Sequence, residues 1–188
     1  FDPLCARHRE LRDFLTRLIT RRFSTEGVTA DRTVGKYLIH DILGKGGWSF
    51  VYRGIHANLN MPVAVKMLKH DLAMKPDFLE RFREEAKIIA RLNHENIVKV
   101  YDIEELFRTI FVVMEYLDGV PLSHTLKQMV RLPLPSALDI LLDVCAGLSY
   151  AHGQGIVHQD IKPSNLFVQP NKRIKIMDFG LACSPGTA

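Results

Sequence analysis

The sequence predicts an α+β fold, in which a five-stranded antiparallel sheet with one helix precedes a mainly helical region. From residue 36 onward the chain contains short runs of alternating or β-branched residues, a pattern typical of strands. Residues 75–92 instead repeat their apolar side chains at helical spacing, which predicts one helix between the third and fourth strands. After residue 119 the helical period dominates. We expect the five strands at residues 37–43, 50–56, 62–68, 97–103 and 109–115.

The region after residue 119 is predicted to contain a short helix at 122–129, a stronger helix at 136–152, and short strands at 166–168 and 174–176. Apolar residues occupy most of the circumference of the 136–152 helix, which is typical of a helix packed on several sides. Few later residues are available to cover it, and the chain begins with Phe1 rather than Met. We therefore expect a piece of a longer protein.

Residues 1–23 are distinct from the rest of the chain. Apolar residues at helical spacing among arginines predict a basic amphipathic helix. We expect this helix to dock on the following domain of the same chain, with a membrane-surface role as the alternative. Residues 24–35 are predicted to be a linker, which leaves a strand-rich region at 36–117 and a mainly helical region at 118–188.

Composition excludes several classes of protein. The 188 residues are 47% hydrophobic and 24% charged, as in ordinary globular proteins. The net charge of +4 fits an anionic ligand such as a nucleotide, but the basic residues are interleaved with acidic ones, so we expect no nucleic-acid binding. No stretch reaches the roughly 18 uninterrupted apolar residues of a transmembrane segment. Cys5, Cys145 and Cys183 lie far apart in sequence, which favours free thiols and a cytoplasmic protein.

A glycine-rich segment lies between the first two predicted strands, with the sequence Gly44-Lys45-Gly46-Gly47-Trp48-Ser49. Glycines let backbone amides approach phosphate oxygens closely, because no β-carbon blocks the approach. A hairpin turn without a ligand is the alternative interpretation. A dinucleotide-binding fingerprint is excluded, since it requires a helix directly after the loop and here a strand follows.

A lysine, Lys66, follows the apolar run Val63-Ala64-Val65 in the third predicted strand. Alone, it could be an exposed strand end. The helical period, however, places Glu85 on the side of the 75–92 helix that faces the sheet, whereas Glu84 points about 100° away. We therefore predict that the Glu85 carboxylate pairs with Lys66 and holds its ammonium for nucleotide phosphates.

Four polar residues near the end of the chain form a set suited to phosphoryl transfer. Asp160 can accept a hydroxyl proton, and Lys162 can neutralise a transferring phosphoryl group. Asn165 and Asp178 can bind magnesium through oxygen atoms. Each residue alone has an alternative interpretation as a polar loop residue, but their joint occurrence in this order does not.

Together these motifs resemble those of the eukaryotic-type serine/threonine protein kinases, over residues 36–188. The resemblance implies the two-lobed kinase fold, with 118–188 as a partial large lobe that ends in the activation segment. It also implies transfer of the γ-phosphoryl group of ATP to a Ser or Thr hydroxyl of a protein substrate, with Mg²⁺ as cofactor. Lys162 favours a serine/threonine kinase over a tyrosine kinase.

The resemblance implies a role for each motif residue. Asp160 would be the catalytic base and Lys162 its phosphate-neutralising partner, while Lys66, positioned by Glu85, would hold the α- and β-phosphates. Met114 would be the gatekeeper beside the adenine pocket, and residues 115–117 the hinge that hydrogen-bonds adenine. The implied ATP contacts are Leu43, Gly44, Lys45, Gly46, Gly47, Trp48, Ser49, Val51, Ala64, Lys66, Met114, Glu115, Leu117 and Phe167. The implied magnesium ligands are Asn165 and Asp178.

Two residues depart from the family pattern. Ser49 replaces the third loop glycine, which stiffens the loop slightly. Gln159 replaces an arginine that in the family pairs with an activation-loop phosphate, and a neutral amide cannot do so with comparable strength. Ser184 is the only phosphoacceptor that precedes Thr187 in the short segment after Gly180. We therefore expect activity that does not depend on phosphorylation of this segment.

Two other functions remain open from the sequence. Gln159 permits a regulatory, pseudokinase-like module that binds nucleotide without catalysis, although Lys66, Asp160, Asn165 and Asp178 are all present. A small-molecule kinase of the same fold is the other alternative. The run from Lys162 to Asn165 favours protein substrates.

Overall fold

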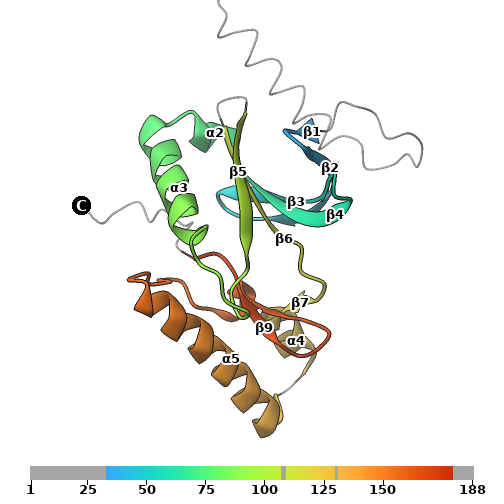
Figure 1. Cartoon of the computed structure of the whole chain (residues 1–188). Helices are drawn as coiled ribbons and strands as arrows, with labels where there is room; N and C mark the ends of the chain where they lie inside the picture. Colours follow the sequence, from blue (N-terminus) through green and yellow to red (C-terminus); the bar gives the residue numbers. More distant parts are fainter. Residues whose placement is uncertain (1–32, 107–108, 130, 180–188) are drawn as a thin grey trace, which may run out of the picture.

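The computed structural model describes residues 33–106, 109–129 and 131–179 (Figure 1). The helix predicted at 1–23, most of the predicted linker and the segment after residue 179 lie outside the described residues. Within them, a six-stranded sheet with one long helix forms the first lobe, and two helices with a three-stranded sheet form the second. The two-lobed α+β architecture is therefore confirmed.

The six-stranded sheet is antiparallel throughout, in the order β1-β2-β3-β4-β6-β5. Alternation along β4 sends Val63 and Val65 to a core on one face of the sheet, and Ala64 to the larger core on the other face. Lys66 follows Ala64 at the same spacing, so it points to the second face. The strands are β1 (Thr33–Val34), β2 (Tyr37–Lys45), β3 (Ser49–His56), β4 (Met61–Leu68), β5 (Val100–Leu106) and β6 (Thr109–Glu115).

Two predictions for this sheet are wrong. Strand β1 lies inside the predicted linker at 24–35, so the described sheet has six strands rather than five. The strand predicted at 97–103 begins only at Val100, because Ile97 forms a parallel bridge with Ile176 of the second lobe instead. Next to this bridge, the Val98 backbone N–H donates to the Ile176 carbonyl over 2.9 Å. The segment before β5 thus joins the two lobes.

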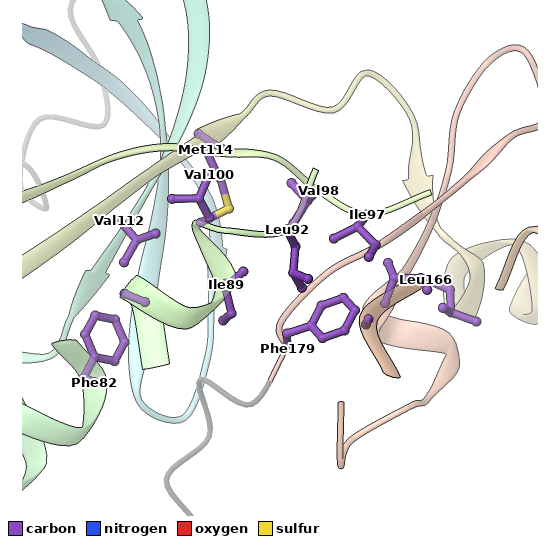
Figure 2. Packing of buried hydrophobic residues seen from close by; sticks show 14 of the residues in the cluster. Phe82, Ile89, Leu92, Ile97, Val98, Val100, Val112, Met114, Leu166 and Phe179 are labelled. Carbon is purple, nitrogen blue, oxygen red and sulfur yellow. The ribbon is translucent and has the colours of Figure 1, made fainter. Parts of the chain in front are cut away.

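Helix α3 (Pro76–Ile89) replaces the slightly longer helix predicted at 75–92 and follows a short, unpredicted helix α2 (His70–Ala73). A proline in the first turn suits a helix start, because its missing N–H has no intrahelical partner there. One face of α3 buries Phe82, Ala86 and Ile89, as the helical period predicted. Figure 2 shows Phe82 beneath the sheet and Ile89 closer to Phe179 of the second lobe. Helix α3 therefore shares one core with both lobes.

The second lobe contains two helices and a small sheet of order β7-β8-β9. The short strands predicted at 166–168 and 174–176 are confirmed, and β7 is an addition. Helix α5 packs on β9 at Gly147, where an added β-carbon would lie 2.8 Å from the Ile176 Cδ1 atom. The elements are β7 (Val120–Pro121), α4 (Leu122–Gln128), α5 (Leu134–Gly153), β8 (Leu166–Val168) and β9 (Ile174–Ile176).

The opposite face of α5 is apolar and open within the described part of the chain (Figure 1). Leu134 is 71% exposed and Leu142 69% exposed, so the described residues do not pack this helix on several sides as predicted. By length and composition alone, α5 is the one described helix that could span a membrane. Its Asp143, however, accepts a hydrogen bond of 2.8 Å from the Ile174 backbone N–H, which ties the helix to β9.

Candidate active site

A cavity of about 380 Å³ lies where the two lobes meet. Strands β2, β3 and β4 contribute one side, and Phe167 of β8 contributes the other. The apolar walls predicted at Val51, Ala64 and Phe167 therefore enclose one space. The predicted site residues in its lining are Leu43, Gly44, Val51, Ala64, Lys66, Met114, Glu115, Leu117, Phe167 and Asp178.

The cavity also includes residues that are not among the implied ATP contacts: Val98, Tyr116, Gly119, Pro121 and Met177. Tyr116 lies inside the predicted hinge, and Met177 directly precedes Asp178, so position alone could have indicated both. Gly119 has φ +155°, and an added β-carbon would lie 2.2 Å from the Val168 carbonyl oxygen. Only glycine fits at this close approach of the hinge to β8. No local sequence pattern indicated that Val98 lines the cavity, because its position depends on the backbone pairing with Ile176.

Lys66 is the buried cation of the cavity. Its side chain is 8% exposed, and its Nζ donates a hydrogen bond of 2.8 Å to Oδ1 of Asp178, whose side chain is 39% exposed. An ammonium removed from water needs a charged partner, because its desolvation is costly. The pair brings a residue of the first lobe and one of the second together, a contact that the sequence analysis did not predict.

The predicted partner of Lys66, Glu85, is only partly described. Its backbone lies in α3, between the buried residues Phe82 and Ala86. Its side chain lies outside what the structure describes, so pairing with Lys66 stays a prediction. Glu84 is exposed and accepts a hydrogen bond of 2.7 Å from Lys87, as expected for the outward-facing neighbour.

The glycine-rich loop between β2 and β3 borders the cavity through Gly44. A β-carbon added at Gly44 or Gly47 would meet no heavy atom within 4 Å. Packing within the described residues therefore does not require glycine at either position. A ligand that fills the open space beside the backbone would require glycine there. The Gly46 N–H donates to the Ser49 carbonyl over 2.8 Å, which closes a turn at the tip. The remaining loop residues, 45–49, do not line the cavity.

His158 anchors the segment that carries Asp160. It is 1% exposed, and its ring centroid lies 4.5 Å from that of Phe179. The Asp160 backbone N–H donates to His158 Nδ1 over 3.2 Å. Because Nδ1 accepts, Nε2 carries the ring proton and donates it to the Met177 carbonyl oxygen, 2.8 Å away. One buried imidazole therefore holds both the Asp160 and the Asp178 segments.

The Asp160 carboxylate is fixed on one oxygen. Lys162 Nζ donates to Oδ2 over 2.6 Å, and Asn165 Nδ2 donates to the same oxygen over 3.1 Å. These contacts, the hydrogen bond from Lys162 foremost, hold the pKa of Asp160 below its ordinary value. The carboxylate is thus ionised at neutral pH. Among the described residues no group hydrogen-bonds to Oδ1, which leaves that oxygen to accept a proton.

The predicted metal ligands fit a magnesium ion in their chemistry. Asn165 is 6% exposed, and its Nδ2 also donates to the Asp160 carbonyl over 2.9 Å, so its amide orientation is fixed. The Met177 N–H donates to the Asn165 carbonyl over 2.8 Å, which places Asn165 beside the segment of Asp178. Mg²⁺ prefers oxygen ligands and is usually held by one or two protein groups together with substrate phosphates. Within the described residues no group of three His, Cys, Asp or Glu side chains could hold a metal alone.

An ion pair that the sequence analysis missed ties the hinge to the second lobe. Lys175 of β9 donates a hydrogen bond of 2.7 Å to Glu115, the first residue of the predicted hinge. Both side chains are largely buried, at 12% and 23% exposure. The Glu115 N–H donates to the Lys99 carbonyl over 2.8 Å, so its backbone and side chain are both fixed. No local pattern links residues 60 positions apart.

A comparison with protein families decides the identity. The family model of the protein kinase domain matches residues 37–187, which include every motif described above. The chain belongs to the protein kinase family. The resemblance to this family and its fold are therefore confirmed.

Curated relatives of this kinase chain are named serine/threonine-protein kinases. PknA of Mycobacterium tuberculosis is 40% identical over 153 residues, which cover 79% of this chain and 36% of the relative. PknB of Mycolicibacterium smegmatis is 42% identical over 151 residues, which cover 78% of this chain and 24% of the relative. The chain thus spans between 24% and 36% of the length of these relatives.

Solved kinase structures share the fold. The kinase domain of PknI from M. tuberculosis superposes with a TM-score of 0.72 at 30% identity, covering 85% of this chain and 65% of that one. Rad53 residues 1–466, in complex with AMP-PNP, give a TM-score of 0.69 at 26% identity, covering 81% of this chain and 40% of that one.

Proposed function

We propose that the protein of which this sequence is part transfers the γ-phosphoryl group of ATP to serine or threonine hydroxyls of proteins. The observation that carries the proposal is that two ion pairs lie on segments joined by hydrogen bonds. Lys66 and Asp178 form the first pair and line the cavity. Lys162 and Asp160 form the second pair, outside the cavity lining, and His158 and Asn165 join their segment to Met177, which directly precedes Asp178. The first pair suits a nucleotide phosphate and the second suits a hydroxyl nucleophile.

Each of these residues has its own role in the proposed phosphoryl transfer. Asp160 accepts the proton of the substrate hydroxyl while the hydroxyl oxygen bonds to the γ-phosphorus. The bond between that phosphorus and the β–γ bridging oxygen breaks, and ADP leaves. Lys162, 2.6 Å from Asp160, is close enough to neutralise charge on the transferring phosphoryl group. Lys66 holds the phosphates of the departing ADP in place. The hydrogen bonds to Asp160 Oδ2 orient the carboxylate before substrate binds.

Asn165 and Asp178 are the residues that hold magnesium in this proposal. When bound, Mg²⁺ supplies positive charge that neutralises the phosphate oxygens. Asp178 is oriented by its 2.8 Å contact with Lys66, and Asn165 is oriented by its two hydrogen bonds to Asp160.

Protein hydroxyls are the proposed acceptors, because the curated relatives are named serine/threonine-protein kinases. The test is to incubate the full-length protein with γ-labelled ATP, Mg²⁺ and a mixed protein substrate, and then to identify the labelled amino acids. Labelled phosphoserine or phosphothreonine supports the proposal. ATP binding without transfer would identify a regulatory nucleotide-binding module instead, and labelling confined to small alcohols would identify a small-molecule kinase.

A further inference from the structure

The tip of the glycine-rich loop contacts helix α3. Trp48 is 39% exposed at this tip, and its ring centroid lies 5.6 Å from that of Phe78, with the two planes tilted by 33°. Phe78 is in the first turn of α3 (Pro76–Ile89) and also packs against the large core cluster. These dimensions are those of a favourable aromatic pair. The Trp48–Phe78 pair is called the tip contact below.

The same loop is held from its other side by the end of β4. Lys69 Nζ donates a hydrogen bond of 2.7 Å to the Gly47 carbonyl, and the Lys69 backbone N–H donates to the Trp48 carbonyl over 2.9 Å. The Lys69 ammonium also lies 5.5 Å from the ring centroid of Phe50. The loop tip is thus placed between a strand end and the start of a helix.

We propose that Trp48 and Phe78 are positioning residues, which couple the glycine-rich loop to helix α3 and order the loop before nucleotide binds. The proposal rests on the proposed function, since it assigns the nucleotide phosphates to the space beside Gly44 and Gly47. A glycine-rich segment has high conformational freedom, and fixing it at the moment of binding costs affinity. The tip contact removes part of that cost in advance. It also links the loop to α3, the helix whose backbone carries Glu85.

The coupling predicts which ligands respond to loss of the tip contact. Phe78→Ala should weaken Mg·ATP affinity by about 2- to 10-fold, the range expected for an aromatic pair. Adenosine affinity should stay unchanged, because the hinge side of the cavity is untouched. Trp48→Ala should match Phe78→Ala, whereas Trp48→Phe should restore affinity because the ring pair is kept. Tyr101→Ala, which removes an aromatic side chain of similar exposure (42%) on β5, is the matched control and should bind ATP normally.

Trp48 is the only tryptophan of the sequence, so fluorescence reports on the tip contact without any nucleotide. The emission of the nucleotide-free protein should move to longer wavelength in Phe78→Ala, because water then reaches the exposed ring face. Phe78→Leu, which keeps an apolar side chain against the core, should fold normally and still show the reduced ATP affinity.

The experiment is a double-mutant cycle on the purified protein, measured by titration calorimetry with Mg·ATP and with adenosine. Loss of ATP affinity in each single variant, with no further loss in Trp48→Ala/Phe78→Ala, supports the coupling. Additive losses, or equal losses for ATP and adenosine, would overturn it while leaving the proposed function intact. If Phe78→Ala shows the emission shift but the wild-type protein binds neither ligand, the proposed function is overturned, and the nucleotide coupling with it.

Discussion

Replacing Asp178 by asparagine separates the contribution of the Lys66–Asp178 pair to stability from its contribution to nucleotide binding. The Lys66 side chain is 8% exposed and the Asp178 side chain 39% exposed. Asp178→Asn leaves a buried ammonium without the one charged partner that the described residues give it. Lys66→Met instead leaves a carboxylate that water reaches, and fills the volume of the lysine with an apolar side chain. The two variants should therefore differ in stability, although each loses a contact to the nucleotide.

The expected magnitudes follow from this asymmetric burial. A hydrogen bond to a charged group contributes about 1.5–3 kcal/mol, and the partial exposure of Asp178 reduces that value. Asp178→Asn should lower the free energy of unfolding by about 1–2 kcal/mol, which lowers Tm by about 2–8 °C for a domain of this size. Lys66→Met should change it by less than about 1 kcal/mol. Both variants should weaken Mg·ATP affinity by more than about tenfold, or about 1.4 kcal/mol.

The assay is thermal unfolding of the nucleotide-free protein, followed by circular dichroism, with calorimetric titration of Mg·ATP on the same samples. The double variant Lys66→Met/Asp178→Asn should recover the stability of Lys66→Met, because no buried ammonium remains. Equal destabilisation by both single variants would refute the reasoning about burial. Unchanged ATP affinity in both would refute the assignment of the cavity to nucleotide phosphates.

Three further predictions concern the pH profile, regulation and the hinge. Because the lowered pKa keeps Asp160 ionised, phosphoryl transfer should fall only as pH drops through that pKa. Lys162→Met should move this acidic limb of kcat/KM to higher pH, and an unmoved limb would contradict the cause given for the shift. Phosphatase treatment of the full-length protein should leave activity unchanged, since Gln159 offers no charge to a phosphate. A large fall in activity that rephosphorylation within residues 178–187 reverses would contradict this prediction. Glu115→Gln should lower the free energy of unfolding, measured with denaturant, by about 1–3 kcal/mol, because it leaves the Lys175 ammonium buried without a charged partner. Lys175→Met should lower it by less.

The parts of the site that the sequence predicted are those set by local order. Asp160, Lys162 and Asn165 lie within six residues of one another, so a single loop brings them together. The alternation of β4 likewise fixed the face on which Ala64 and Lys66 lie. Such features depend on residue type and spacing, which a sequence displays directly.

The parts that the sequence did not predict depend on contacts between distant segments. The apolar run at 97–103 has the pattern of a strand, but Ile97 pairs with Ile176 across the lobes instead of joining the sheet. The Lys175–Glu115 and Trp48–Phe78 contacts likewise join elements far apart in the chain. Charge and aromatic character are visible at each position, but the partner is set by tertiary packing. Strand β1 is only two residues long, too short for any period.

Phosphoryl transfer by an Asp160→Asn variant of the full-length protein is the most direct test of the proposed chemistry. Asparagine keeps the shape of the side chain and an oxygen to accept from Lys162, but it cannot take up the hydroxyl proton. We predict that the variant binds Mg·ATP within about twofold of the wild-type affinity, while transfer of label from γ-labelled ATP to protein falls by about 10²- to 10⁴-fold. Wild-type turnover in this variant would contradict the role of Asp160 as catalytic base.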